Sequence, residues 1–161
     1  MVADFFNPCL KRASLYRRAV GYFTGSGLAQ AAKGIASLVE RQGRMQLVAS
    51  PCLEEVDVEA LRQGHEDRES VLKRVIVKQF SDVENILVRQ RLNALAWLVA
   101  NGTLEVRLAI RIDNRGRPAK GIYHEKIGIF ADEQANMVTF TGSSNETTGG
   151  LVDNFESIRV F

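Results

Sequence analysis

Apolar residues recur along the chain with two different periods, and the changes between these periods predict its elements. After Pro8 the apolar residues follow a helical spacing that reaches Tyr16. Residues 18–24 then have the composition of a strand, and the helical spacing returns over 28–43. A second strand is predicted at 44–50. This strand–helix–strand unit implies two parallel strands joined by a right-handed crossover.

The middle of the chain is predicted to be helical. A short helix covers 53–64, and 66–101 contains neither proline nor glycine while its apolar residues keep steps of three and four. We expect one long helix here, or two helices with a break near Arg89–Arg91. Because no uniform heptad persists, packing on a sheet is favoured over a coiled coil.

The last third of the chain is rich in strands. The predicted strands are 104–112, 122–130, 137–143 and 155–161. Helices alternating with strands in the first half place the chain in the α/β class. Its 161 residues suit a single domain, 1–161. Because the chain stops directly on the last predicted strand, we expect it to be a domain of a longer protein.

Composition and charge narrow the picture further. No apolar run reaches the roughly 18–20 residues of a membrane span, and the N-terminus lacks the apolar segment of a signal peptide. We therefore expect a cytoplasmic protein with no membrane partner. The two cysteines, Cys9 and Cys52, lack C-x-x-C spacing and are expected to be free thiols. The net charge of +2 is too small to indicate nucleic-acid binding by itself.

The stretch YHEKIGIF, residues 123–130, carries the candidate chemistry. Alternate residues of a strand share a face, so His124 and Lys126 are expected to project together. Histidine can act as a nucleophile or an acid–base group near neutral pH, and a lysine ammonium can bind a phosphate oxygen. A zinc helix of the H-E-x-x-H type is excluded because position 128 is glycine and the segment has strand character. We expect no metal and no cofactor.

Small polar residues follow on the next two strands. The sequence TGSSN places Gly142, Ser143 and Asn145 at the end of the strand after His124, and Glu156 belongs to the last strand. If these strands are neighbours, the polar groups come near the histidine–lysine pair. Serine and asparagine can donate hydrogen bonds to phosphate oxygens, and a glutamate can orient an imidazole. Together they suit the charge of a phosphoryl transition state.

The pattern HEKIGIFAD…TGSSN resembles the H-x-K-(x)4-D…G-S-x-N signature of the phospholipase D superfamily. The whole chain is also similar to the phospholipase D-like domain at the N-terminus of some bacterial superfamily 2 helicases, and to the catalytic part of metal-independent restriction endonucleases. The resemblance implies a phospholipase D-like mixed β-sheet flanked by helices. It further implies a metal-independent nuclease that cuts DNA through a phosphohistidine, with a helicase as a candidate C-terminal domain of the same polypeptide.

The resemblance also implies a role for each site residue. His124 would be the nucleophile or general acid, while Lys126 and Asn145 would hold the phosphate. Ser143 would support the phosphate site, and Glu156 would orient a histidine. Gly142 would have a structural role in the Gly-Ser-x-Asn turn.

Two departures from the family pattern have consequences. Ala131 stands where the family has its aspartate, and Asp132 follows one residue later, so we expect Asp132 to be structural. Resembling enzymes use two motifs, one histidine to attack phosphorus and one to protonate the leaving group. The chain's other histidine, His65, has Asp67 where a lysine is needed. The family pattern therefore implies a homodimer that pairs His124 with its symmetry mate.

The loop before the motif suggests the substrate. Within 111–120 it carries four cations, Arg111, Arg115, Arg117 and Lys120. They are interpreted either as a binding surface for a polyanionic backbone or as a solvated loop. DNA cleavage is thus the first hypothesis. The alternatives are a DNA-binding module with little or no cleavage activity, and a phospholipid phosphodiesterase.

Overall fold

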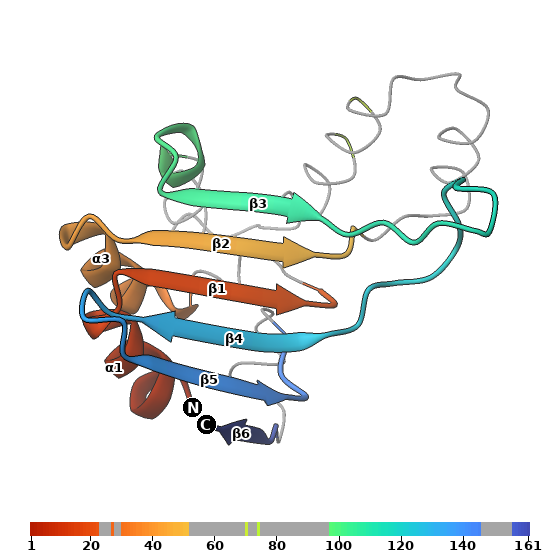
Figure 1. The fold of residues 1–161 in the computed structure, drawn as a ribbon. Helices are drawn as coiled ribbons and strands as arrows, with labels where there is room; N and C mark the ends of the chain where they lie inside the picture. The colour runs from red at the N-terminus through yellow and green to blue at the C-terminus, as the bar shows by residue number, and fades with distance from the viewer. Residues whose placement is uncertain (23–26, 28–29, 52–69, 71–73, 75–96, 146–155) are drawn as a thin grey trace.

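The computed structural model describes residues 1–22, 27, 30–51, 70, 74, 97–145 and 156–161 (Figure 1). The predicted helix at 53–64 and most of that at 66–101 lie outside these residues, as does Cys52. The described strands are β1 (Leu15–Val20), β2 (Arg44–Ala49), β3 (Leu104–Leu108), β4 (Lys126–Ala131), β5 (Met137–Gly142) and β6 (Ile158–Val160). The described helices are the short π-helical segment η1 (Val2–Phe6), α1 (Asn7–Arg12) and α3 (Ala32–Glu40).

The six strands form one mixed sheet in the order β3-β2-β1-β4-β5-β6. β1 pairs in parallel with β2, and β2 with β3, whereas β4 is antiparallel to both β1 and β5, and β6 is antiparallel to β5. The parallel pairing expected of the first strand–helix–strand unit is therefore confirmed. The strands predicted at 122–130 and 137–143 are neighbours, since β4 pairs with β5, so the condition set for a shared site is met. The chain has an α/β architecture built on a mixed sheet.

The first predicted boundary was wrong. The predicted helix after Pro8 ends at Arg12, and β1 begins at Leu15, so Tyr16 belongs to a strand and not to a helix. The predicted strand at 18–24 correspondingly ends at Val20. Tyr16 fits both periods in sequence, but β1 has a paired neighbour on each side, and those two ladders decide its conformation.

Two later strands are shorter than predicted. The strand expected at 104–112 ends at Leu108, and the strand expected at 122–130 begins only at Lys126. The backbone N–H of Tyr123 donates to the Ser50 hydroxyl at 3.2 Å, so it does not take part in the β-ladder. His124 therefore lies just before β4. The final strand is also short, and only Ile158–Val160 is regular.

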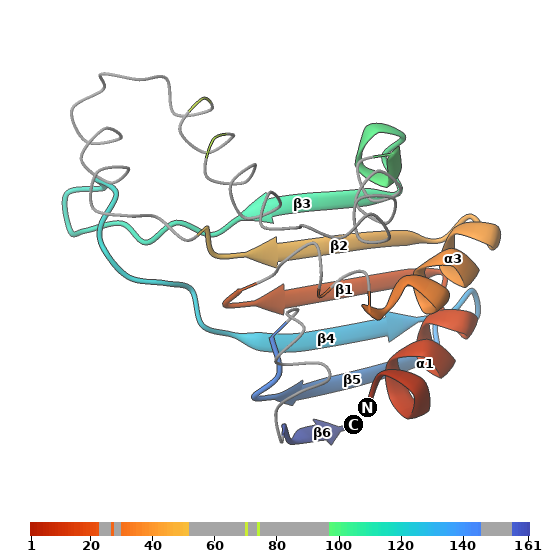
Figure 2. The same cartoon turned by 180° about the vertical axis from the view of Figure 1, so that it is seen from behind.

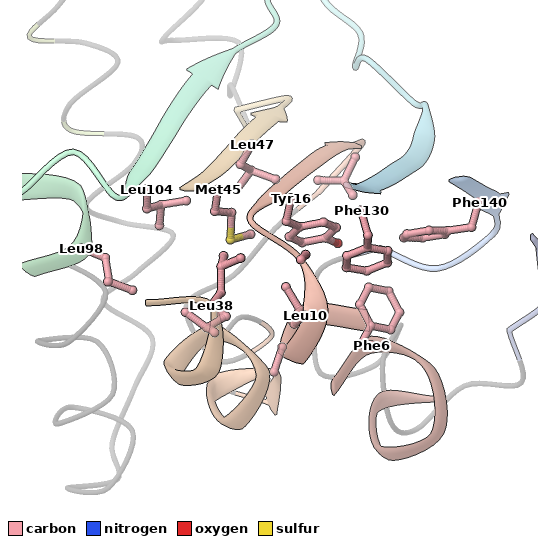
Figure 3. Close-up of a cluster of buried hydrophobic side chains, with 14 of the residues drawn as sticks. Phe6, Leu10, Tyr16, Leu38, Met45, Leu47, Leu98, Leu104, Phe130 and Phe140 are labelled. Carbon is pink, nitrogen blue, oxygen red and sulfur yellow. The ribbon is translucent and has the colours of Figure 1, made fainter. Parts of the chain in front are cut away.

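The core lies between the sheet and the helices α1 and α3, which cover one face of it (Figure 2). Its aromatic centre stacks the ring of Tyr16 on Phe130, with 4.5 Å between centroids. Phe6, Phe140 and Leu10 pack around that pair (Figure 3). Each such buried side chain contributes about 1.5–3 kcal/mol through removal of apolar surface from water. This cluster holds β1, β4 and β5 side by side and so determines which loops meet at the sheet's end.

Candidate functional site

The predicted site residues other than Asp132 lie toward one end of the sheet, where the parallel and antiparallel halves join. β1 and β5 end there, and β4 and β6 begin there (Figure 1). Val20 pairs with Lys126, and Gly142 pairs with Ile158. The sheet thus brings together four segments that are distant in sequence.

His124 and Lys126 form a direct contact. Nζ of Lys126 lies 3.0 Å from Nε2 of His124 and donates to the His124 carbonyl oxygen at 3.3 Å. When Lys126 is charged, its ammonium can only donate, so Nε2 of His124 is the acceptor in this contact. His124 is exposed, whereas Lys126 is 8% exposed. The two side chains meet as expected, although His124 is outside the regular strand.

The pKa of the Lys126 ammonium is lowered. Burial is the main cause, and the positive charge of Arg18 adds to it, while Glu156 and Glu125 act in the opposite direction. A partly desolvated cation suits an anionic ligand, because the negative charge of such a ligand would compensate the buried positive charge.

Gly21 brings Asn145 close to His124. A β-carbon at position 21 would lie 3.1 Å from Cδ2 of His124 and 3.4 Å from Oδ1 of Asn145. The same Oδ1 accepts a hydrogen bond from the Tyr22 N–H at 3.1 Å. With Oδ1 held in this way, the side-chain amide presents Nδ2 as a donor. A side chain at position 21 would crowd the space that histidine and asparagine share.

Ser143 and Glu156 form a second pair at the same end. The Ser143 hydroxyl donates to Oε2 of Glu156, and it accepts from the backbone N–H of Ser157 at 3.3 Å. The resemblance implies a histidine as the partner of Glu156, whereas this hydrogen bond joins it to Ser143. Gly142 allows the close approach, because a β-carbon there would collide with the carbonyl oxygen of Ser157, just before β6.

Asp132 lies at the opposite end of β4, in the turn that leads to β5. It accepts hydrogen bonds from the N–H of Gln134 at 3.0 Å, the N–H of Asn136 at 2.9 Å and the Asn136 side-chain amide at 2.9 Å. These bonds lower the pKa of its carboxyl group, that from the Asn136 side chain most of all. The geometry agrees with the expected structural role and separates Asp132 from the site.

The four cations of the loop before the motif have different partners. Arg117 forms an ion pair with Asp113, with 3.0 Å between Nη2 and Oδ2, and Arg111 donates to the Lys120 carbonyl oxygen at 2.8 Å. The side chains of all four, including Arg115, are on the exposed surface of the loop. Two of the guanidinium groups thus stabilise the loop, which lowers the number of cations that are open to a ligand.

Arg18 is the residue that sequence reasoning missed. Its side chain is 2% exposed, and Nη2 donates to the Ser144 carbonyl oxygen at 2.6 Å. Tyr16 and Val20, two positions away on either side, are both buried. The period of two across Tyr16, Arg18 and Val20 places this arginine on the core face, but the predicted boundary between helix and strand falls between Tyr16 and Arg18, so the alternation is not seen as one run.

Within the described residues, no cluster of three His, Cys, Asp or Glu side chains could hold a metal ion, and no helix there is long and apolar enough to cross a membrane. A search against protein-family models found no match for the chain, and a search of curated proteins found none either. The case for function therefore rests on the geometry of the site.

Proposed function

We propose that the chain is a metal-independent phosphodiesterase of phospholipase D-like fold, a nuclease that cleaves DNA through a phosphohistidine. The observation that carries the proposal is the 3.0 Å contact between Lys126 Nζ and His124 Nε2, with Asn145 and His124 both lying against Gly21. A nucleophilic nitrogen, a cation and an amide donor are the groups that a phosphodiester needs for attack and for charge stabilisation.

The reaction would proceed in two balanced steps. Nε2 of His124 attacks phosphorus, the N–P bond forms, and the bond from phosphorus to the leaving oxygen breaks as that oxygen takes a proton from an acid. Water then attacks phosphorus, the N–P bond breaks, and the proton lost by water is accepted by the same group. Lys126 and Asn145 hold the non-bridging oxygens in both steps.

The acid would come from the His124 of a second copy of the chain. His65 is the other histidine of the sequence, and it lacks the accompanying lysine of the motif. An isologous dimer that faces the two site ends toward each other would supply one imidazole as nucleophile and the other as acid. The exposed position of His124 is compatible with such a pairing.

Cleavage of plasmid DNA in EDTA by the wild type, His124→Ala and His65→Ala tests the proposal, with the mass in solution measured in parallel. We expect the wild type and His65→Ala to cut, and His124→Ala to lose cleavage by about 1,000-fold or more, as nucleophile removal does in other enzymes. DNA binding without cutting by a verified wild-type dimer would favour the non-cleaving module instead. Hydrolysis of phospholipid vesicles but not of DNA would favour the phospholipid phosphodiesterase.

A further inference from the structure

β1 carries two adjacent arginines that point to opposite faces of the sheet. Arg17 is exposed, and its Nε donates to Oε1 of Gln46 at 3.0 Å. Arg18 lies on the core face and is 2% exposed. The pair provides a cationic residue inside the protein and a matched one outside it, on the same strand.

The buried guanidinium is accommodated by specific neighbours. Its central carbon lies 4.8 Å from the centroid of the Phe140 ring, and Nη2 donates to the Ser144 carbonyl oxygen. Gly128 stands opposite Arg18 in the β1–β4 register, and the Phe140 ring occupies the space that a side chain at 128 would need. An apolar residue could fill such a place at no electrostatic cost, so stability alone does not account for an arginine there.

The contact with Ser144 reaches the site directly. Ser144 is the residue between Ser143, which donates to Glu156, and Asn145, which accepts from Tyr22. Because the Ser144 carbonyl is held in the interior by Arg18, the side chains of Ser143 and Asn145 on either side of it are held at the site end of the sheet. The pKa of the Lys126 ammonium is lowered mainly by burial, and the positive charge of Arg18 adds to that effect.

We propose that Arg18 is a positioning residue of the site, which fixes the loop 143–145 through Ser144 and adds a permanent positive charge beneath the place where an anionic phosphoryl group binds. The phosphoryl part rests on the proposed function. The effect of Arg18 on the loop 143–145 and the effect of its charge can both be measured without any cleavage of DNA. A guanidinium remains charged at every pH at which proteins fold, so the field it supplies does not titrate.

Three variants distinguish the effect of Arg18 on the loop 143–145 from the effect of its charge. Arg18→Met removes both the fork of N–H donors and the charge, Arg18→Lys keeps the charge alone, and Arg17→Met is the control on the outer face. The first measurement is an NMR titration of the Lys126 side chain, whose charged and titratable neighbours are His124, Arg18, Glu125 and Glu156. We expect Arg18→Met to raise the pKa of Lys126, while Arg18→Lys and Arg17→Met leave it in place.

The second measurement follows the loop and the ligand. The Asn145 side-chain amide resonances are expected to shift in Arg18→Lys and Arg18→Met but not in Arg17→Met. Affinity for inorganic phosphate by calorimetry is expected to fall about tenfold in Arg18→Met, less in Arg18→Lys, and under about twofold in Arg17→Met.

The outcomes distinguish this inference from the proposed function. Unchanged Lys126 titration, Asn145 resonances and phosphate affinity in Arg18→Met would overturn the inference. If that variant does not fold, unshifted Asn145 resonances and full phosphate affinity in Arg18→Lys would overturn it. A wild type that binds phosphate with the expected Arg18 dependence but cuts no DNA would leave the inference standing and contradict the nuclease.

Discussion

The two ends of β4 are both rich in polar side chains, but they are built in different ways. At the turn end, Asp132 takes its hydrogen bonds from Gln134 and Asn136, which are two and four residues away. At the site end, the hydrogen bonds that hold the loop 143–145 span most of the chain, because Arg18 donates to the Ser144 carbonyl oxygen and the Tyr22 N–H donates to Oδ1 of Asn145.

The difference indicates which end is available for binding. At the turn end the Asp132 carboxylate accepts hydrogen bonds from backbone and side-chain donors of its own turn, so its negative charge is already compensated locally. At the site end Arg18 and Lys126 are both buried, and burial, together with the positive charge of Arg18, lowers the pKa of the Lys126 ammonium. Such an arrangement is electrostatically unfavourable without an anion, and it is the kind that marks functional sites.

Replacement of a lysine at each end of β4 should give the largest difference in DNA cleavage between the two ends. We expect Lys126→Met to lower kcat/KM for DNA cleavage by about 100- to 1,000-fold, because it removes the charge beside the nucleophile. Lys33→Met is the control, since Lys33 is exposed on α3 and lines the groove near the turn end. Thermal unfolding should show that Lys126→Met is at least as stable as the wild type, because a buried charge is gone. Full activity in Lys126→Met would remove the functional distinction between the ends.

Replacement of an asparagine at each end should give a smaller contrast. Asn145→Ala is expected to lower kcat/KM by about tenfold or more, since it removes the proposed charge-assisted hydrogen bond to the phosphate. Asn145→Asp keeps the acceptor for Tyr22 but not the amide donor, and it should be no more active than Asn145→Ala. Asn136→Ala should lower the melting temperature slightly and leave cleavage unchanged. If Asn145→Asp cuts as well as the wild type, the amide is not a phosphate donor.

The smallest difference between the two ends of β4 is expected in the pH dependence of stability. Burial lowers the pKa of Lys126 from 10.5. Between the lowered value and 10.5 the unfolded chain therefore holds more protons than the folded protein. The contribution of Lys126 to the free energy of unfolding rises with pH over that window. The pKa of Asp132 is lowered from 3.8, so its stabilisation is present above 3.8 and is lost as the pH falls through the lowered value.

Urea unfolding of the wild type against Lys126→Met at alkaline pH, and against Asp132→Asn at acid pH, measures the two effects separately. The stability difference between wild type and Lys126→Met should move in favour of the wild type as the pH rises. A difference that moves the other way would mean that the folded protein favours the protonated lysine, and that burial does not dominate at the site end.

Much of the fold could be predicted from local patterns. The strand at 44–50, the strand at 137–143 and the helix within 28–43 are found close to their expected positions, because each is a run with one clear period. The beginning of β1 could not be predicted, since Tyr16 suits a helix or a strand equally. Its conformation depends on β2 and β4, which pair with it from other parts of the chain.

The candidate site shows the same division. Sequence by itself determined the residue types, their order and the local turn around Asp132, because hydrogen bonds between near neighbours need only the chain that connects them. Tertiary structure decided that His124 and Asn145 both lie against Gly21, that Ser143 meets Glu156, and that Arg18 lies beneath the loop. Those contacts depend on which strands pair and in what register, and pairing is settled by the packing of the whole core.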